Sequence, residues 1–190
     1  MKRRVMMVLA AAAVVVAGVG AAFGQSTNSF TGALIVRPSW EYTKTTGASV
    51  LTQTLTDLAL WRHTHGTNAY QMTTLAVASG TLAGEATNTV SLGAMADGFG
   101  DVRSFARVRF MAMQTASNNV DSVRFGGAAV DPFAAWAGDA SDAVTVAPGG
   151  LVMFIAPQAA GYAVGMSTNM MIVNTGTNSA TYYLYVGGHE

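Results

Sequence analysis

Apolar and polar residues alternate in short runs along most of this chain, and this two-residue period is typical of half-buried β-strands. The clearest run is Ser104–Gln114. There the pattern predicts one buried face, made of Ala106, Val108, Phe110 and Ala112. The opposite face would carry Phe105, Arg107, Arg109, Met111 and Met113. The stems of its two arginines can lie over apolar neighbours while their charged heads stay in water.

Similar runs recur through the chain, separated by turn residues. The predicted strands are Ala33–Arg37, Val50–Leu60, Tyr70–Ala78, Thr87–Leu92, Val120–Phe125, Ala143–Val146, Leu151–Ala156, Tyr162–Met166, Met170–Asn174 and Thr181–Val186. The predicted turns are Asp97-Gly98, Gly126-Gly127, Pro148–Gly150, Asn174–Gly176 and Gly187-Gly188. Val50–Leu60 also shows helical spacing, but its β-branched threonines favour a strand, with a helical turn near Asp57–Trp61. Many short strands without a long amphipathic helix predict an all-β fold, an antiparallel β-sandwich, jelly-roll-like, of about eight to ten strands.

The first residues have the pattern of an export signal. Three basic residues at positions 2–4 precede the apolar run Val5–Phe23, and small residues follow. Ala22 and Gly24 fit the −3 and −1 sites of a signal peptidase, so we expect a signal helix that is cleaved before Gln25. The alternative is a retained membrane anchor, because about 20 apolar residues can span a bilayer. Alanine and glycine, which partition weakly into hydrocarbon, make up much of the run and favour cleavage.

This signal sets the expected domain organisation. Residues 1–24 would be the signal peptide, 25–32 a flexible polar lead-in and 33–190 a single β-sandwich domain. The protein would be exported to the cell surface or the extracellular space, with the periplasm as another compartment compatible with the signal. It would contact a membrane only through an uncleaved signal segment.

The composition explains what covers the surface of such a domain. Charged residues are 11% of the 190 residues and hydrophobic ones 51%, whereas soluble domains carry about 25% charge. Removing the three N-terminal basic residues leaves 7 basic groups (10 − 3) against 10 acidic groups, a net charge of −3. This balance argues against nucleic-acid binding, which needs a basic patch. The absence of cysteine excludes disulfides and thiolate metal clusters.

The same composition favours contacts between copies of the chain. Lys44 is the one lysine after residue 24, and lysines commonly protect sheet edges against pairing. If exposed, the runs Leu151–Ile155 and Tyr182–Tyr185 would tend to associate with other chains, so each is expected to be buried or covered by a partner. Interfaces are enriched in aromatic residues and methionine and depleted of lysine and glutamate.

Three groups of residues are candidate metal ligands. His63 and His65 alternate in sequence and would share one face of a strand, in reach of Zn²⁺ or Cu²⁺. Two ligands are too few, and the alternative is a polar turn. The pairs Asp97 and Asp101, and Asp139 and Asp142, offer carboxylates in turn-forming segments. Ca²⁺ takes about six to eight oxygens, and the alternative there is Asx turns and caps. Apart from Ca²⁺ at these acids, we expect no cofactor.

Aromatic residues are the candidates for ligand binding, since aromatic faces stack on sugar rings. They are Trp40, Tyr42, Trp61 and Trp136. Glu41 beside the first two would suit a sugar groove; the alternative is an edge strand. No Gly-x-Ser-x-Gly nucleophile elbow and no Gly-Lys-Ser/Thr phosphate loop occurs. The sequence therefore predicts no catalytic residues.

The second half carries an ordered series of motifs. They are Leu-Gly-x-x-Ala-Asp-Gly-Phe-Gly at Leu92–Gly100, Phe-Ala-Arg-Val-Arg at Phe105–Arg109, Phe-Gly-Gly-Ala-Ala at Phe125–Ala129, Gly-Asp-Ala-Ser-Asp at Gly138–Asp142, Val146–Leu151, Ala156-Pro157, Ala160–Val164 and Tyr183–Gly188. This series, over about Ser91–Gly188, resembles a family of small β-rich proteins encoded among phage and prophage structural genes. The resemblance implies an assembly component and no catalytic residues. The export signal departs from that family and favours a cell-encoded relative that builds outside the inner membrane.

Together these observations predict an exported structural protein that assembles with copies of itself into an oligomer, filament or surface layer. A function of another class is a monomeric adhesin or carbohydrate-binding module that uses the aromatic residues on a surface glycan.

Overall fold

The computed structural model describes residues 31–36, 39–46, 49–56, 59–97 and 100–190, with their side chains from His63 onward. These residues are all-β, with antiparallel sheets and no helix. The described part of the chain contains no helix long and apolar enough to cross a membrane. The predicted signal peptide, its helix and residues 25–30 of the lead-in lie outside the described residues. The chain forms two compact units, whose described parts are 31–63 and 64–190. That 33–190 form one domain stays a prediction.

The first unit is built from hairpin-like pairs of strands. Its strands are β1 (Thr31–Val36), β2 (Ser39–Thr46), β3 (Ser49–Thr56) and most of β4 (Ala59–His65). β2 and β3 are antiparallel from Ser39↔Thr56 to Thr46↔Ser49, and β1 pairs with β4. β1 starts inside the predicted lead-in. The helical turn predicted near Asp57–Trp61 is wrong from Ala59 onward, where the backbone is extended.

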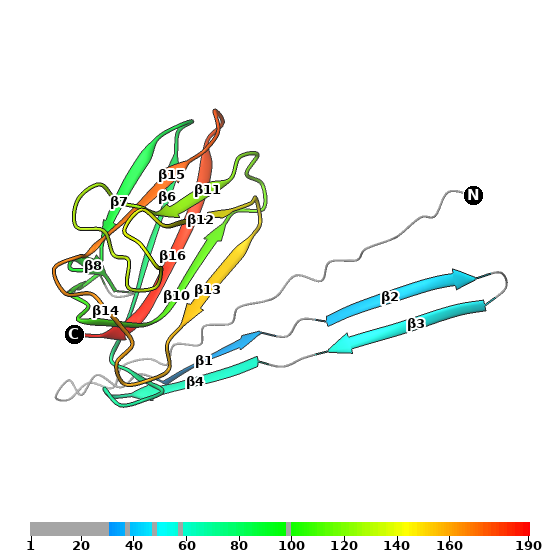
Figure 1. Ribbon diagram of the computed structural model, residues 1–190, viewed down its shortest axis with the longest axis horizontal. Helices are drawn as coiled ribbons and strands as arrows, with labels where there is room; N and C mark the ends of the chain where they lie inside the picture. The colour runs from blue at the N-terminus through cyan, green and yellow to red at the C-terminus, as the bar shows by residue number, and fades with distance from the viewer. Residues whose placement is uncertain (1–30, 37–38, 47–48, 57–58, 98–99) are drawn as a thin grey trace. The chain divides into compact units, whose positions relative to one another are not determined.

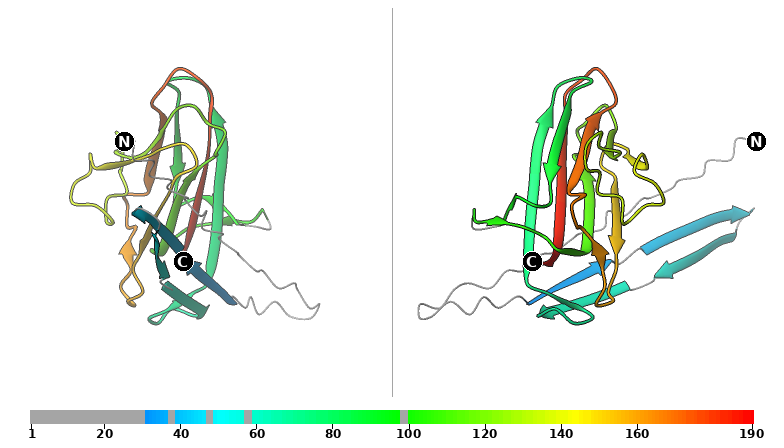
Figure 2. Two further views of the ribbon diagram at one scale, coloured as in Figure 1. Left: turned by 90° about the vertical axis from the view of Figure 1, so that its right-hand side faces the viewer. Right: turned by 60° about the vertical axis from the view of Figure 1, so that its left-hand side comes forward.

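The second unit consists of a five-stranded sheet, a four-stranded sheet and smaller pairings (Figure 1). Its strands are β5 (Gln71–Met72), β6 (Thr74–Leu82), β7 (Thr87–Ser91), β8 (Met95–Ala96), β9 (Val102–Arg103), β10 (Arg107–Thr115), β11 (Val123–Gly126), β12 (Ala143–Val146), β13 (Leu151–Ile155), β14 (Tyr162–Ala163), β15 (Asn169–Asn174) and β16 (Ala180–His189). The first sheet has the order β13-β10-β16-β6, with β14 also paired to β10, and the second has β12-β11-β15-β7. The chain passes from one sheet to the other six times, between β6 and β7, β7 and β10, β10 and β11, β12 and β13, β14 and β15, and β15 and β16, so both sheets hold strands from all parts of the unit (Figure 2).

One hydrophobic cluster takes side chains from both sheets. Met111 and Leu184 of the first sheet and Phe125 and Ile172 of the second are fully buried in it. The Tyr182 ring meets the Phe125 ring edge-on, with centroids 6.2 Å apart. Asn88 Nδ2 donates a 2.7 Å hydrogen bond to the Tyr182 hydroxyl, so this buried aromatic has its polar end satisfied. Each fully buried side chain of this size contributes about 1.5–3 kcal/mol through removal from water.

The face assignment predicted for Ser104–Gln114 is wrong on both sides of Val108: before it, Phe105 is buried in the core cluster and Ala106 is exposed. The pairing of β10 with β16 shifts register between Val108 and Phe110, which marks a β-bulge at Arg109. Because one extra residue reverses the alternation, Val108, Met111 and Met113 point into the core cluster. Phe110 and Ala112, predicted to face the core with Val108, lie on the opposite face of the sheet.

Gly187 and Gly188 do not form the predicted turn, since both lie inside β16. An added Cβ at Gly187 would come within 2.6 Å of the Met72 sulfur. At Gly188 it would overlap the carbonyl oxygen of Arg107 on the neighbouring strand. Glycine is therefore required here by close approach of neighbouring groups and not by turn geometry.

Candidate interaction surface

The feature that distinguishes the second unit is the outer face of its first sheet. Alternate residues of β6, β16, β10 and β13 enter the core, so the residues between them lie on the opposite face. The strand registers align these residues in three rows across the sheet. The rows are Leu75–Gly187–Phe110–Ile155, Val77–Tyr185–Ala112–Met153 and Ser79–Tyr183–Gln114–Leu151. We call these twelve positions the outer face.

The outer face is apolar and without charge. Its first two rows contain no polar side chain apart from one tyrosine hydroxyl, and the third adds one serine, one glutamine and a second tyrosine. Val77 is 39% exposed, and the residues of β13 are all half-buried. Phe110, Ala112 and Gly187 between them are buried, so the accessible apolar part of the face lies on β6, β13 and the tyrosines of β16. Exposed apolar patches are a common mark of interaction sites.

The second sheet presents a different face on its other side. Met170 and Ile172 of β15 enter the core, and Met171 and Val173 between them lie outward. In register with these outward residues are threonines of β7 and Arg124 of β11. The two outer faces therefore differ in polarity, and the apolar one belongs to the first sheet.

One end of the outer face is covered by the segment before β6. Met72 is 4% exposed, and its thioether lies over Gly187 next to the Phe110 ring. The Thr73 amide donates a 2.9 Å hydrogen bond to the Gly188 carbonyl, which holds the segment against β16. This contact explains why Phe110, although outward, is only 9% exposed.

Arg109 is buried beside this covered end. It is 0% exposed, and Nη2 donates to the Thr67 carbonyl at 2.8 Å and lies 3.3 Å from His189 Nε2. In the described structure its Nε and Nη1 have no hydrogen-bond partner. Burial, and to a lesser extent the charge of Arg107, lowers the pKa of Arg109.

The two candidate histidines differ in environment. His63 is 3% exposed, whereas His65 is exposed at the end of β4. Among the described residues, no three His, Asp or Glu side chains gather in a way that could hold a metal ion.

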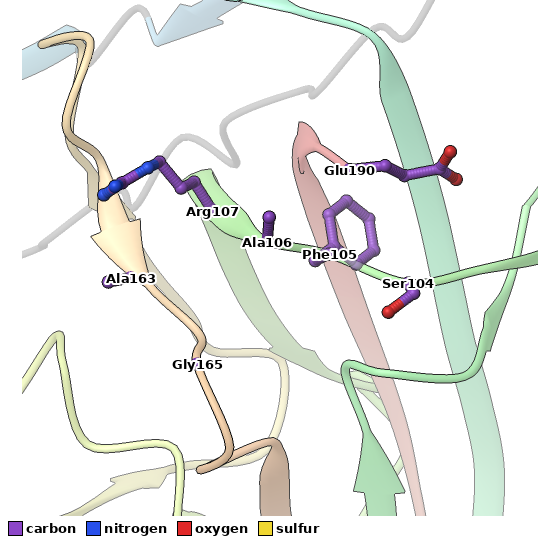
Figure 3. A pocket seen from close by; sticks show the side chains of 7 residues that line it. All are labelled: Ser104, Phe105, Ala106, Arg107, Ala163, Gly165 and Glu190. Atoms are coloured by element: carbon purple, nitrogen blue, oxygen red, sulfur yellow. The ribbon is translucent and has the colours of Figure 1, made fainter.

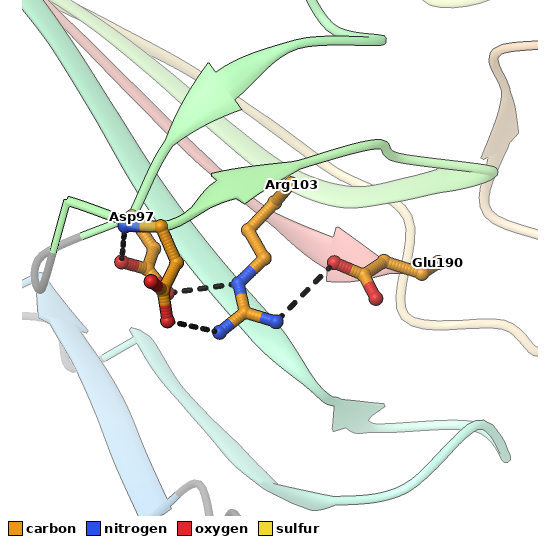
Figure 4. A network of polar contacts seen from close by, with 4 residues as sticks. Asp97, Arg103 and Glu190 are labelled. Carbon is orange, nitrogen blue, oxygen red and sulfur yellow. Dashed lines mark hydrogen bonds and ion pairs between the residues drawn. The ribbon is translucent and has the colours of Figure 1, made fainter.

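The first pair of candidate acids binds an arginine. Arg103 Nε donates to Asp97 Oδ2 at 2.8 Å and its Nη2 to Asp101 at 3.2 Å (Figure 4). Its Nη1 lies 3.8 Å from Glu190, so the network ties the β8–β9 hairpin to the C-terminal residue. The hydrogen bond to Asp97 raises the pKa of Arg103. A guanidinium thus takes the position that a cation would need at these carboxylates.

The second pair of acids caps its own loop. Asp142 Oδ2 accepts the amides of Gly138 and Asp139, and Asp139 Oδ1 accepts the amide and hydroxyl of Ser141. The bonds from Ser141 lower the pKa of Asp139. These are Asx-type turns, in which the carboxylates serve the local backbone.

Of the four aromatic candidates, only Trp136 lies where side chains are described. Its Nε1 donates to the Phe133 carbonyl at 2.8 Å, and its ring packs on Phe154 with centroids 4.8 Å apart. It fastens the loop after β11 to the core. Trp40 and Tyr42 in β2 and Trp61 in β4 have side chains outside the described residues.

A shallow depression lies at the C-terminal end of β16 (Figure 3). It measures about 510 Å³ and is lined by Ser104, Phe105, Ala106, Arg107, Ala163, Gly165 and Glu190. The Arg107 and Glu190 side chains extend in opposite directions from it, and Arg107 Nη1 donates to the Ala160 carbonyl at 2.8 Å. Its charged groups do not converge on one point, so it has no arrangement of acid, base and nucleophile.

Sequence reasoning singled out two strands of the outer face, Leu151–Ile155 and Tyr182–Tyr185, as surfaces needing cover. It missed Leu75 and Val77 of β6, and it placed Phe110 and Ala112 in the core. No local signal could have found these, because only the register brings the four strands together.

The chain matches no protein-family profile, no curated protein and no solved structure.

Proposed function

We propose that this chain is an exported, non-enzymatic structural protein that assembles with copies of itself through the outer face of the β13-β10-β16-β6 sheet. The apolar, uncharged rows of that face carry the proposal. The partner that suits them best is the same face of a second copy, because an isologous contact pairs a surface with itself. No charge would then be removed from water when two such faces meet.

We further propose that the second unit is a jelly-roll sandwich. Apart from the two-residue strands, it has eight strands in chain order from β6 to β16. In a jelly roll the first, eighth, third and sixth strands form one sheet, and the second, seventh, fourth and fifth form the other. The orders β6-β16-β10-β13 and β7-β15-β11-β12 support this arrangement. Jelly rolls occur in capsid and lectin domains, in keeping with the resemblance to phage structural proteins.

Export is part of the proposal and rests on the N-terminal pattern. The protein recovered from the cell envelope or medium should begin at Gln25, which N-terminal sequencing tests. A chain that still begins at Met1 would replace cleavage by a membrane anchor.

The experiment for assembly is sedimentation velocity of the exported protein over a range of concentrations. We expect the mean mass to rise with concentration. A monomer at all concentrations would refute the proposal, and a monomer that also binds on a glycan array would favour the carbohydrate-binding function instead.

A further inference from the structure

The segment that covers the end of the outer face is held in a costly conformation. We call residues 66–73 the strap. Its β5 residues pair with the end of β4, where Thr64 N–H donates to the Tyr70 carbonyl at 3.1 Å. Three further hydrogen bonds fasten it to the body of the second unit: Thr73 N–H to the Gly188 carbonyl at 2.9 Å, Tyr70 N–H to the Pro157 carbonyl at 2.8 Å, and Arg109 Nη2 to the Thr67 carbonyl at 2.8 Å. In this position the strap lays Met72 over Gly187.

Two features of the closed strap are unfavourable. Tyr70 has φ of 58°, a left-handed conformation that is strained for a bulky residue. Tyr70 is also 54% exposed, so the packing of its side chain does little to offset this strain. Beneath the strap, the Arg109 guanidinium is fully buried, and the described residues offer no carboxylate to pair with it. A buried charge without a counter-ion is strongly destabilising.

We propose that the strap is a gate that opens while the rest of the second unit stays folded, and that opening uncovers the Gly187–Phe110 row of the outer face. Opening releases Tyr70 from strain and lets water reach Arg109. It breaks the hydrogen bonds to Gly188, to Pro157 and from Arg109. It also exposes the apolar side chain of Met72 to water, which opposes opening. A segment that is held by few contacts, and whose closed position carries strain and a buried charge, belongs to the least stable parts of a fold.

The consequence for assembly rests on the proposed function. The row beneath Met72 is continuous with the Val77–Tyr185 row. A second copy therefore meets a longer apolar face when the strap is open.

Methionine oxidation measures the opening, because the chain contains its own references. Peroxide transfers one oxygen to a thioether, giving a sulfoxide and water, and does so only where the sulfur is reachable. Met111 is fully buried in the core and Met166 is 91% exposed. In the exported protein at low concentration, mass spectrometry of peptides should show Met72 oxidising at least tenfold faster than Met111, and more slowly than Met166.

Two substitutions test the cause. Tyr70→Asn suits the left-handed conformation, and Arg109→Met removes the buried charge but keeps a long apolar side chain. Each should slow Met72 oxidation about tenfold. Arg124→Met is the control, since Arg124 lies on β11 of the other sheet; it should leave the rate unchanged.

Several results would overturn the gate. One is Met72 oxidation as slow as that of Met111. Another is faster oxidation in Arg109→Met, which would mean that the bond to Thr67 stabilises the closed strap more than burial of the charge opposes it. If Arg109→Met fails to fold, Tyr70→Asn decides alone. A protein that stays monomeric refutes the proposed function, yet the Met72 rate still decides whether the strap opens.

Discussion

Placing a carboxylate on the outer face gives the sharpest test of assembly. Met153 lies on β13 in the central row, next to Ala112 of β10, and is half-buried. Replacing it by aspartate puts a short charged side chain on this face. Unlike lysine, aspartate cannot extend its charge around the sheet edge into water. The monomer should fold, because the position is not part of the core cluster.

The size of the effect follows from the dimensions of the face. Strands lie about 4.8 Å apart and same-face residues about 6.8 Å apart along a strand, so each position covers about 33 Å². The two rows outside the strap then cover about 260 Å² per copy, and the row beneath the strap raises this to about 400 Å² when it is uncovered, at most about half of a standard protein interface. We therefore expect weak association, measurable at micromolar to millimolar concentrations. Burying an unpaired carboxylate in the contact costs about 3 kcal/mol or more, which lowers the association constant at least about 100-fold.

The control is the same substitution on the other sheet. Met171→Asp lies on the polar outer face beside Thr89 of β7, also at a half-buried methionine. Sedimentation of both variants and the parent protein, with circular dichroism to verify folding, gives the comparison. Met153→Asp should be monomeric where the parent associates, and Met171→Asp should behave like the parent. Equal association of all three would refute the assignment of the outer face.

Three further predictions concern the fold of the second unit. Gly188→Ala should lower the free energy of unfolding in urea titrations by about 3 kcal/mol, because the added Cβ would overlap the Arg107 carbonyl. The control is Gly93→Ala, where the atom nearest to the added Cβ is 3.5 Å away. This substitution should change the free energy of unfolding by less than about 0.5 kcal/mol. Trp136→Phe should cost about 1 kcal/mol by the same measurement, because it loses the bond from Nε1, and an unchanged stability would show that this bond contributes nothing. The pKa of Asp139 is lowered in the fold, so its stabilising effect is present above its unfolded pKa of about 4 and is lost as the pH falls through the folded value. Asp139→Asn should therefore be less stable than the parent at neutral pH and equal to it in acid, and a difference that persists in acid would contradict this.

The strands were predictable from alternation, but their partners were not. Ala143–Val146 is a strand with the predicted bounds, and Thr87–Leu92 and Leu151–Ala156 differ from β7 and β13 by one residue each. The hairpin of β8 and β9 was missed because strands of two residues are too short to show a period. Gly187-Gly188 was taken for a turn, since its real cause, close approach of Met72 and Arg107, involves residues far away in sequence.

The candidate surface was predictable only in part. The low charge of the chain predicted self-association. So did the runs Leu151–Ile155 and Tyr182–Tyr185, which would need to be buried or covered by a partner. The position of the face depended on the bulge at Arg109, which turns Phe110 and Ala112 away from the core. Both faces of β10 are apolar, so either assignment satisfies the pattern, and only the pairing with β16 decides between them.

The difference between the two outer faces also limits the form of assembly. A single apolar face that pairs with itself closes on two copies and leaves nothing to extend. The opposite face, with the exposed threonines of β7, keeps favourable contacts with water and gains little from being covered. Growth into a filament or layer would therefore need a second, heterologous contact. β6, β13, β7 and β12 are the edge strands of the second unit and carry unpaired backbone groups. If the outer face acts alone, the sedimenting mass should stop at twice that of the monomer. A mass that continues to grow in Met153→Asp would place the main contact at these edges.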